Sequence, residues 1–487
     1  MEISTLWWCI LAGCLQLATC KNDESTEIRD SQESSQNGAS EATTPIDPSN
    51  LEPLFLSPMI ETCDYDTAQN KSRVQYFRQY GINSSAYSGY ITVNKTTKNN
   101  MFFLLIEAEE NATTAPLMLW TQGGPGLSAL FGLFLQNGPV QIKYPTNVSR
   151  RQPTIQQNMS VLYLDAPVGA GFSFSNTSSY PAQMEDVIID IVEFMKQFLQ
   201  LFSQYKKREF YVAGDSYAAR YSVMLAEKML KEKSLLDLDL QGVIGGVGFL
   251  APVLQLADSS DFLYQVSMLN FQGYTFLKDH FKNMSIIFPQ NSTIALGMLL
   301  STIFTSETQK TLFQNLTQYD DHASPLYTKR PLDMYACVGY VNDTNFKIAI
   351  HAGANASVQF ANPHLLYRFA SDWLVDVKDS LEYVLNNTRV LLYSGQLDVL
   401  FPARNMQLYL EMFNWTESDA YRTADRRAWQ PYSKYYGSAG YTKTAGNFTF
   451  AVLLGMSHYA GYDKPEEVYY MMMQFVNKEL AFQLRDA

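Results

Sequence analysis

Short, uninterrupted apolar runs alternate along this chain with longer segments of helical period, and this rhythm limits the folds it can adopt. An apolar run of roughly four to eight residues without alternation is typical of a strand buried on both faces of a sheet. Helical segments at 185–202 and 219–233 each follow such a run, and strand–helix–strand units build parallel sheets. We therefore predict an α/β fold with a mostly parallel sheet flanked by helices. Its strands are expected at 101–108, 117–120, 161–166, 210–213, 243–250, 389–394 and 448–454.

The rhythm of strands and helices is interrupted once. Between residues 251 and 368 amphipathic stretches replace it, without a clear strand pattern. We expect a helical cap at 251–368, inserted between two parts of one α/β core at 51–250 and 369–487.

The N-terminal region indicates export. Residues 1–20 hold an apolar run from Leu6 to Ala18 that ends in small residues. The run is too short to span a bilayer comfortably, so we predict a cleaved secretory signal. Because no Lys or Arg precedes it, an uncleaved anchor is the alternative. Residues 21–50 carry seven acidic and two basic side chains among many Ser and Thr, which predicts a disordered acidic segment, either a propeptide or a spacer.

Cysteines and glycosylation sequons agree with a secreted or lysosomal protein. Cleavage after Cys20 would leave only Cys63 and Cys337. An even pair in an oxidising compartment favours one disulfide between them, and two separate buried thiols are the alternative. N-x-S/T sequons, which mark surface glycosylation in exported proteins, begin at Asn70, Asn83, Asn94, Asn111, Asn147, Asn158, Asn176, Asn283, Asn291, Asn315, Asn342, Asn355, Asn386, Asn414 and Asn447.

Composition excludes several kinds of partner. The chain has 48 acidic and 36 basic residues, a net charge of -12, and nucleic-acid binding depends on Lys and Arg that neutralise phosphates. It has five His and neither H-E-x-x-H nor C-x-x-C spacing, so we expect no metal site and no cofactor. After signal cleavage no segment is long and apolar enough for a membrane span. Whether the chain forms a homodimer stays open.

A nucleophile motif stands at Gly214-Asp215-Ser216-Tyr217-Ala218. It follows an apolar strand and opens a helix, the context of a nucleophile elbow that projects one Ser hydroxyl at the carboxyl end of a sheet. Small residues must flank so tight a turn, and Gly214 and Ala218 are small. A plain helix-capping serine is the alternative reading of Ser216.

The base and its orienting acid follow from chain order. In elbow enzymes the Ser precedes an Asp or Glu, which precedes the His. Asp398 lies just past a buried strand and a Gly turn, and His458 is the single His after it. His458 also follows a predicted strand and a small-residue turn, so all three side chains are expected at one edge of the sheet. A solvent-exposed His458 is the alternative.

These motifs resemble those of serine carboxypeptidases, and within that family most of all the vitellogenic-like carboxypeptidases. The resemblance covers most of residues 85–480. The matching stretches, in chain order, are S-G-Y-I at 88–91, L-W-T-Q-G-G-P-G at 119–126, N-G-P at 137–139, D-A-P-V-G-A-G-F-S at 165–173, G-D-S-Y-A at 214–218, Y-V-N at 340–342, S-G-Q-L-D at 394–398 and G-M-S-H at 455–458.

The resemblance implies an α/β-hydrolase fold with a helical insertion and the removal of C-terminal amino acids from peptides or proteins through an acyl-enzyme. It assigns catalysis to Ser216, Asp398 and His458, and the oxyanion hole to the N–H groups of Gly124 and Tyr217. It assigns binding of the substrate carboxylate to Gln122, Gly123, Gln136 and Asp215. Read alone, residues 123–126 are an ordinary tight loop.

The carboxylate site departs from the family pattern. Relatives typically have Glu where this chain has Gln136 and Asp215, and the two acids share a proton. Gln136 cannot share a proton as an acid, and a charged Asp215 repels a carboxylate unless Gln136 satisfies it by hydrogen bonding. Tyr459 also replaces an apolar residue beside the base.

Three functions therefore remain open at this point. The first is a carboxypeptidase acting on peptides with apolar C-terminal residues. The second is the same scaffold acting as an esterase or acyltransferase, and the third is a non-catalytic binding protein.

Overall fold

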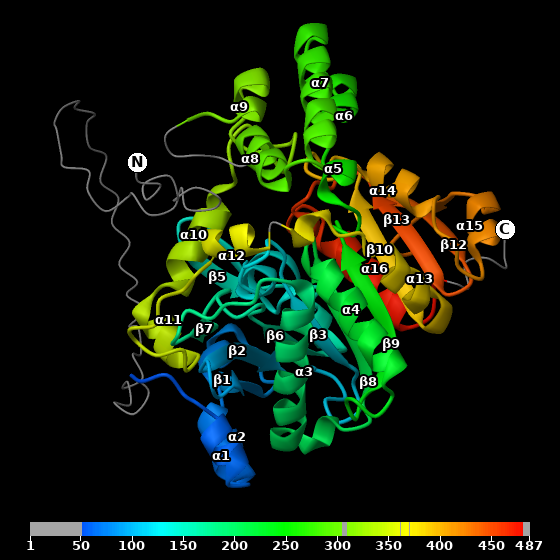
Figure 1. Cartoon of the computed structure of the whole chain (residues 1–487). Helices are drawn as coiled ribbons and strands as arrows, with labels where there is room; N and C mark the ends of the chain where they lie inside the picture. Colours follow the sequence, from blue (N-terminus) through cyan, green and yellow to red (C-terminus); the bar gives the residue numbers. More distant parts are fainter. Residues whose placement is uncertain (1–50, 304–308, 361, 370, 481–487) are drawn as a thin grey trace, which may run out of the picture.

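One large twisted sheet runs through the protein and carries helices on both faces (Figure 1). The computed structural model describes residues 51–303, 309–360, 362–369 and 371–480. The predicted signal and acidic segment, 1–20 and 21–50, lie outside these residues and stay predictions. Within them the sheet has 11 strands in the order β1-β2-β6-β3-β8-β9-β10-β13-β12-β11, and β7 pairs with β2.

The six central strands are parallel, as the uninterrupted apolar runs predict. They are β6 (Ser160–Leu164), β3 (Leu117–Thr121), β8 (Glu209–Asp215), β9 (Asp239–Gly246), β10 (Arg389–Gly395) and β13 (Phe448–Leu453). Antiparallel strands close both sides: β1 (Ala86–Asn94), β2 (Asn99–Ile106) and β7 (Phe174–Ser175) on one, β12 (Gly440–Ala445) and β11 (Arg427–Trp429) on the other. A separate hairpin joins β4 (Val140–Lys143) to β5 (Asn147–Arg150).

Each of the seven predicted strands overlaps an observed one, and the mostly parallel α/β fold is confirmed. The prediction was wrong at the end of β9, which stops at Gly246 rather than at residue 250. Val247 has a φ of +41°, so the chain turns out of the sheet there. The strands β1, β7, β11 and β12 of this sheet were not predicted, because their residues lack a continuous apolar run.

The sheet separates two hydrophobic cores. On one face pack α3 (Met184–Leu201), α4 (Ala218–Lys231) and α13 (Lys378–Asn387), and on the other packs α16 (Pro465–Val476). Successive residues of a strand face opposite sides, so in β10 Leu392 enters the first core and Tyr393 the second. The remaining core helices are α1 (Ser57–Glu61), α2 (Tyr65–Ser72), α14 (Ala403–Leu410) and α15 (Ser418–Thr423).

Between β9 and β10 the described residues form helices and no strand. Before α13, the α-helices are α5 (Val253–Leu256), α6 (Ser260–Gln265), α7 (Phe271–Ile287), α8 (Ser292–Ile303), α9 (Leu312–Thr317), α10 (Leu332–Val341), α11 (Thr344–Ala349) and α12 (Pro363–Arg368). Helices α6 to α9 project together above the sheet at the top of Figure 1. Within the described residues, no helix has the length and apolar character needed to cross a membrane.

The predicted disulfide between Cys63 and Cys337 is wrong, since both cysteines are free. Cys63 is exposed and follows α1, the helix at the bottom of Figure 1, whereas Cys337 lies on α10 and is buried in the second core. Burial raises the pKa of the Cys337 thiol. One of the two is therefore a surface thiol and the other a core residue.

This difference in exposure predicts a difference in reactivity. Iodoacetamide should alkylate Cys63 in the native protein and Cys337 only after unfolding, because the thiolate of a buried cysteine is neither formed nor accessible. Peptide mapping by mass spectrometry before and after denaturation measures both. Alkylation of neither cysteine without prior reduction would instead show that the two are joined.

Candidate active site

The turn after β8 holds Ser216 in a strained conformation. β8 ends at Asp215 and α4 begins at Ala218, and Ser216 between them has a φ of +57°. A residue other than Gly rarely adopts such a backbone conformation unless its surroundings impose it. Here β9 and the residues after it do so: the Ser216 N–H donates to the Gly246 carbonyl (2.8 Å), and the Ser216 carbonyl accepts from the Phe249 N–H (3.0 Å).

Small residues make this turn sterically feasible. A Cβ on Gly214 would come within 2.7 Å of the Ala218 Cβ, and one on Gly123 within 2.7 Å of the Ser216 Cβ. Both distances are shorter than real Cβ contacts allow. The flanking glycine that the motif predicted is thus required by packing, and the loop after β3 lies directly against the elbow.

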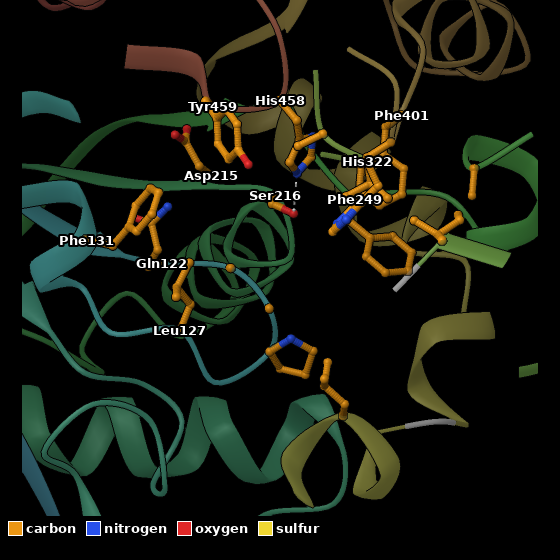
Figure 2. A pocket seen from close by; sticks show the side chains of 18 of the residues that line it. Gln122, Leu127, Phe131, Asp215, Ser216, Phe249, His322, Phe401, His458 and Tyr459 are labelled. Carbon is orange, nitrogen blue, oxygen red and sulfur yellow. Dashed lines mark hydrogen bonds between the residues drawn. The ribbon is translucent and has the colours of Figure 1, made fainter. Parts of the chain in front are cut away.

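Asp398 and His458 meet Ser216 in one hydrogen-bonded chain. The His458 Nδ1 lies 2.9 Å from the Asp398 Oδ2, and its Nε2 lies 3.1 Å from the Ser216 Oγ. β10 and β13 are parallel neighbours, so the loops that follow them emerge at the same edge as the elbow. Asp398 is fully buried, and its second oxygen accepts the Phe401 N–H (2.8 Å). These bonds fix the carboxylate, which in turn orients the imidazole. Figure 2 shows His458 beside Ser216.

The Gly123–Gly124 loop and the start of α4 face each other beside Ser216. A Cβ on Gly123 would lie 3.0 Å from the backbone N of Tyr217, and Gly124 has a φ of +116°, which favours glycine. The Tyr217 side chain turns away and donates its hydroxyl to Asp372. The predicted oxyanion residues Gly124 and Tyr217 therefore border the nucleophile.

Asp215, directly before the nucleophile, is a buried carboxylate held by two donors. Its Oδ1 accepts from the Tyr393 hydroxyl and its Oδ2 from the Gln136 amide, both at 2.8 Å. Burial raises the pKa of Asp215 to about 6, although the hydrogen bond from Tyr393, the charge of His458 and the bond from Gln136 all oppose the rise. The predicted contact between Gln136 and Asp215 is present.

The Gln136 amide is fully occupied on its donor side. Its Nε2 donates to Asp215 and also to the Tyr459 carbonyl (3.3 Å), while its Oε1 is buried without a hydrogen-bond partner among the described residues. Gln122 is oriented the other way, because its Oε1 accepts from the Trp120 indole (3.1 Å). Of the two glutamines, Gln122 is the one whose amide N–H groups are left for a ligand.

A cavity of about 1290 Å³, counting its opening to solvent, surrounds Ser216. In Figure 2 the polar Gln122, Asp215 and Tyr459 lie on one side of Ser216, and Phe249 and Phe401 on the other. The wall around Phe249 and Phe401 is continued by Val253, Ala257, Leu299, Ile303, Leu366, Trp373 and Leu400. The described residues hold no group of three or more side chains suited to a metal ion.

Tyr393 is a site residue that the sequence analysis missed. Its hydroxyl reaches Asp215 across β9 because residue 246 is glycine, where a Cβ would come within 2.0 Å of the Asp215 Oδ1 and 2.3 Å of the Tyr393 hydroxyl. The available signal was the Gly245-Gly246 pair at the end of a buried strand. Such glycines mark the close approach of another group.

Comparisons with known proteins agree with this geometry. The model of the serine carboxypeptidase family matches residues 77–478. The chain belongs to the serine carboxypeptidase family. The resemblance expected from the motifs is thus confirmed, and the protein shares the hydrolase class of this family.

Named relatives of this serine carboxypeptidase cover almost its whole length. The human probable serine carboxypeptidase CPVL is 32% identical over 87% of this chain and 90% of its own. The venom serine carboxypeptidase of Apis mellifera is 31% identical over 88% and 91%, and the vitellogenic carboxypeptidase of Aedes aegypti 27% over 88% and 90%. The solved structure of a prohormone-processing carboxypeptidase from Saccharomyces cerevisiae superposes with a TM-score of 0.70 at 16% identity, over 84% of this chain and 96% of that one, and shows the shared α/β-hydrolase fold.

The buried Asp215 predicts a pH-dependent stability. Because its pKa is raised from 3.8 to about 6 in the folded state, the folded protein binds the proton more tightly than the unfolded one, so Asp215 costs stability as pH rises from about 4 to about 6. Relative to Asp215→Asn, the free energy of unfolding of the wild type should fall by on the order of 3 kcal/mol over that interval and then level off. Urea unfolding at pH 4 to 7 measures it.

The matched control is Asp237→Asn, at an exposed position before β9. It should leave the pH dependence of stability unchanged. A constant difference between the wild type and Asp215→Asn at every pH would mean that Asp215 carries the same protonation state in both folded and unfolded chains.

Proposed function

We propose that this protein is a serine-type carboxypeptidase that releases C-terminal amino acids from peptides through an acyl-enzyme on Ser216. The observation that carries the proposal is the continuous chain from the Ser216 Oγ through His458 to the buried Asp398. Family membership supports the reaction class, and the residue roles rest on the geometry.

The chemistry proceeds in two halves. His458 Nε2 accepts the Ser216 proton as Oγ attacks the scissile carbonyl carbon, and Asp398 stabilises the imidazolium. The N–H groups of Gly124 and Tyr217 donate hydrogen bonds to the carbonyl oxygen and stabilise the negative charge that develops on it. His458 then protonates the leaving amine, the C–N bond breaks, and the acyl group stays on Ser216. Water, deprotonated by His458, releases it and restores the hydroxyl.

The two walls of the cavity suggest the orientation of the peptide. The apolar wall at Phe249 and Phe401 suits an apolar side chain on the acyl side of the scissile bond, since burial there removes it from water. The polar side with Gln122, Gly123, Gln136 and Asp215 would take the leaving residue and its carboxylate. This arrangement favours peptides with apolar side chains near the C-terminus.

Ester hydrolysis or acyl transfer is the second candidate function, and one observation favours it. Both donor directions of Gln136 are occupied by Asp215 and the Tyr459 carbonyl, so this side of the site presents fewer free donors to a carboxylate than the resemblance implies. An ester has no free carboxylate that the site must bind. The ratio of peptide to ester turnover distinguishes the two.

We also propose that the protein passes through the secretory pathway and acts as a secreted or lysosomal enzyme. Of the fifteen sequon asparagines, all but Asn158 have exposed side chains, and Asn158 is half-buried. An oligosaccharide at these positions would enter solvent without disturbing the core. The predicted signal at 1–20 supports the same route.

The first test of catalysis is active-site labelling. A fluorophosphonate should label the wild type and not Ser216→Ala, because only an activated hydroxyl attacks phosphorus at neutral pH. Thermal unfolding of the two proteins should coincide, since the Ser216 hydroxyl is not a core group. Labelling of the variant at the wild-type rate would move the nucleophile elsewhere, and a wild type that stays unlabelled would favour a non-catalytic binding protein.

The second test concerns pH. In Gln136→Glu two carboxyl groups face each other at residues 136 and 215, and like charges at this distance raise the pKa of one of them. The retained proton can then be donated to a substrate carboxylate at low pH. We expect kcat/KM for a blocked dipeptide to rise at pH 4 to 5 and to fall more steeply towards pH 7 than in the wild type.

The matched ester of the same dipeptide is the control for Gln136→Glu. Its hydrolysis should change little, because it lacks the carboxylate. If the pH profiles of kcat/KM for the dipeptide are parallel in the wild type and Gln136→Glu, residue 136 does not bind the C-terminal carboxylate. An equal change in kcat/KM for the dipeptide and the ester would show the same.

A further inference from the structure

The polar side of the cavity lacks a positive charge in the predicted carboxylate site. Asp215 offers only acceptor atoms when ionised, and the free atom of the Gln136 amide is its acceptor oxygen. Only Gln122 and the Gly123 backbone remain as donors in the predicted site, both uncharged. A carboxylate placed there would face the buried Asp215 with no charge to compensate it.

Arg330 supplies the missing charge. It precedes α10, and among the described residues it is the one Arg or Lys that lines the cavity around Ser216. Burial acts to lower the pKa of its guanidinium, but Tyr459 and Asp321 outweigh burial and leave the pKa raised. The side chain therefore stays positively charged at every pH in which the enzyme is folded.

One contact places this guanidinium next to the polar side of the cavity. Arg330 contacts the side chain of Tyr459, whose carbonyl accepts from Gln136. Arg330 also acts on His322, whose pKa is lowered to about 3 by burial and by the charges of Arg330 and His458. The cation is thus one residue, Tyr459, removed from the Gln136–Asp215 pair.

The guanidinium is not saturated by its neighbours. Its Nε is buried and has no hydrogen-bond partner in the described part of the chain. The nearby acid, Asp321, accepts at its Oδ1 from the Tyr459 hydroxyl and the Ala323 N–H, each at 2.9 Å, and its Oδ2 is buried without a hydrogen-bond partner among the described residues. A buried donor atom without a partner is costly, and a bidentate carboxylate would remove that cost.

We propose that Arg330 binds a carboxylate of the leaving amino acid and is a specificity-determining residue of this enzyme. The carboxylate is either the C-terminal one or the side chain of a C-terminal Asp or Glu, and the experiment below separates the two. This inference rests on the proposed function. The family resemblance assigns carboxylate binding to residues that include Gln136 and Asp215, whereas this inference assigns it to Arg330.

The test compares the wild type, Arg330→Met, Arg330→Lys and Lys329→Met on blocked dipeptides. Lys329 is the adjacent exposed residue, so its variant removes the same charge outside the cavity. Arg330→Met should lower kcat/KM for a dipeptide ending in Glu about 30- to 100-fold, mainly through KM, as expected for the loss of a charge-assisted bond. Arg330→Lys should recover part of the loss, and Lys329→Met should match the wild type.

Matched substrates identify the carboxylate. If Arg330 binds the C-terminal carboxylate, Arg330→Met loses activity on dipeptides ending in Leu, Gln or Glu alike. Its kcat/KM for the methyl ester of the Leu dipeptide then equals that of the wild type. If it holds a side chain, the loss is confined to the dipeptide ending in Glu. An equal loss on the ester, no rescue by Lys, or wild-type kinetics in Arg330→Met would overturn the proposal and reduce Arg330 to a partner of Asp321.

A second readout does not require peptidase activity. The acid 3-phenylpropionate should protect Ser216 of the wild type from fluorophosphonate better than 3-phenylpropionamide does, and Arg330→Met should abolish that preference. If peptides are not cleaved but the preference holds, the proposed function fails while the carboxylate site stands. Equal protection by acid and amide in the wild type contradicts the carboxylate site itself.

Discussion

The hydrogen bond from the Ser216 N–H to the Gly246 carbonyl fixes a turn that the chain would not otherwise adopt, and the rest of the site is positioned from it. A non-glycine residue at positive φ costs on the order of 1–3 kcal/mol and persists only where the surroundings impose it. Here two parallel strands impose it, β8 by ending at Asp215 and β9 by receiving the turn. Placing the acid and the base then requires only that β10 and β13 end at the same edge, which their parallel register ensures.

Glycine is used in this site where backbone and side chains must approach closely. Gly123 lets the loop after β3 lie against Ser216, and Gly246 lets the Tyr393 hydroxyl cross to Asp215. The second contact has an electrostatic consequence, because it stabilises a carboxylate that burial would otherwise keep protonated. Above a pH of about 6 Asp215 is a negative group beside the nucleophile, and a carboxylate substrate then needs a positive partner. Arg330 is suitably placed for that role.

Much of this arrangement could be predicted from the sequence, because the signals are local. Ser216 stands between a strand and a helix, and Asp398 and His458 each follow a buried strand, so chain order and strand polarity bring them together. The pairing of Cys63 with Cys337 failed because it rested on counting rather than on distance. Tyr393 and Arg330 were missed for another reason: one belongs to a buried strand and the other to a loop before α10, and only the tertiary fold brings them to Ser216.

The central claim is that one site cleaves the last peptide bond of a chain with a free carboxylate. The most direct measurement is time-resolved mass spectrometry of a peptide with apolar C-terminal residues and of the same peptide with an amidated C-terminus, each incubated with the enzyme at pH 5. The account predicts successive loss of single residues from the C-terminus of the free acid, with the amide cleaved far more slowly and no internal fragments from either. Equal cleavage of both peptides, internal fragments, or an inert free acid would contradict it.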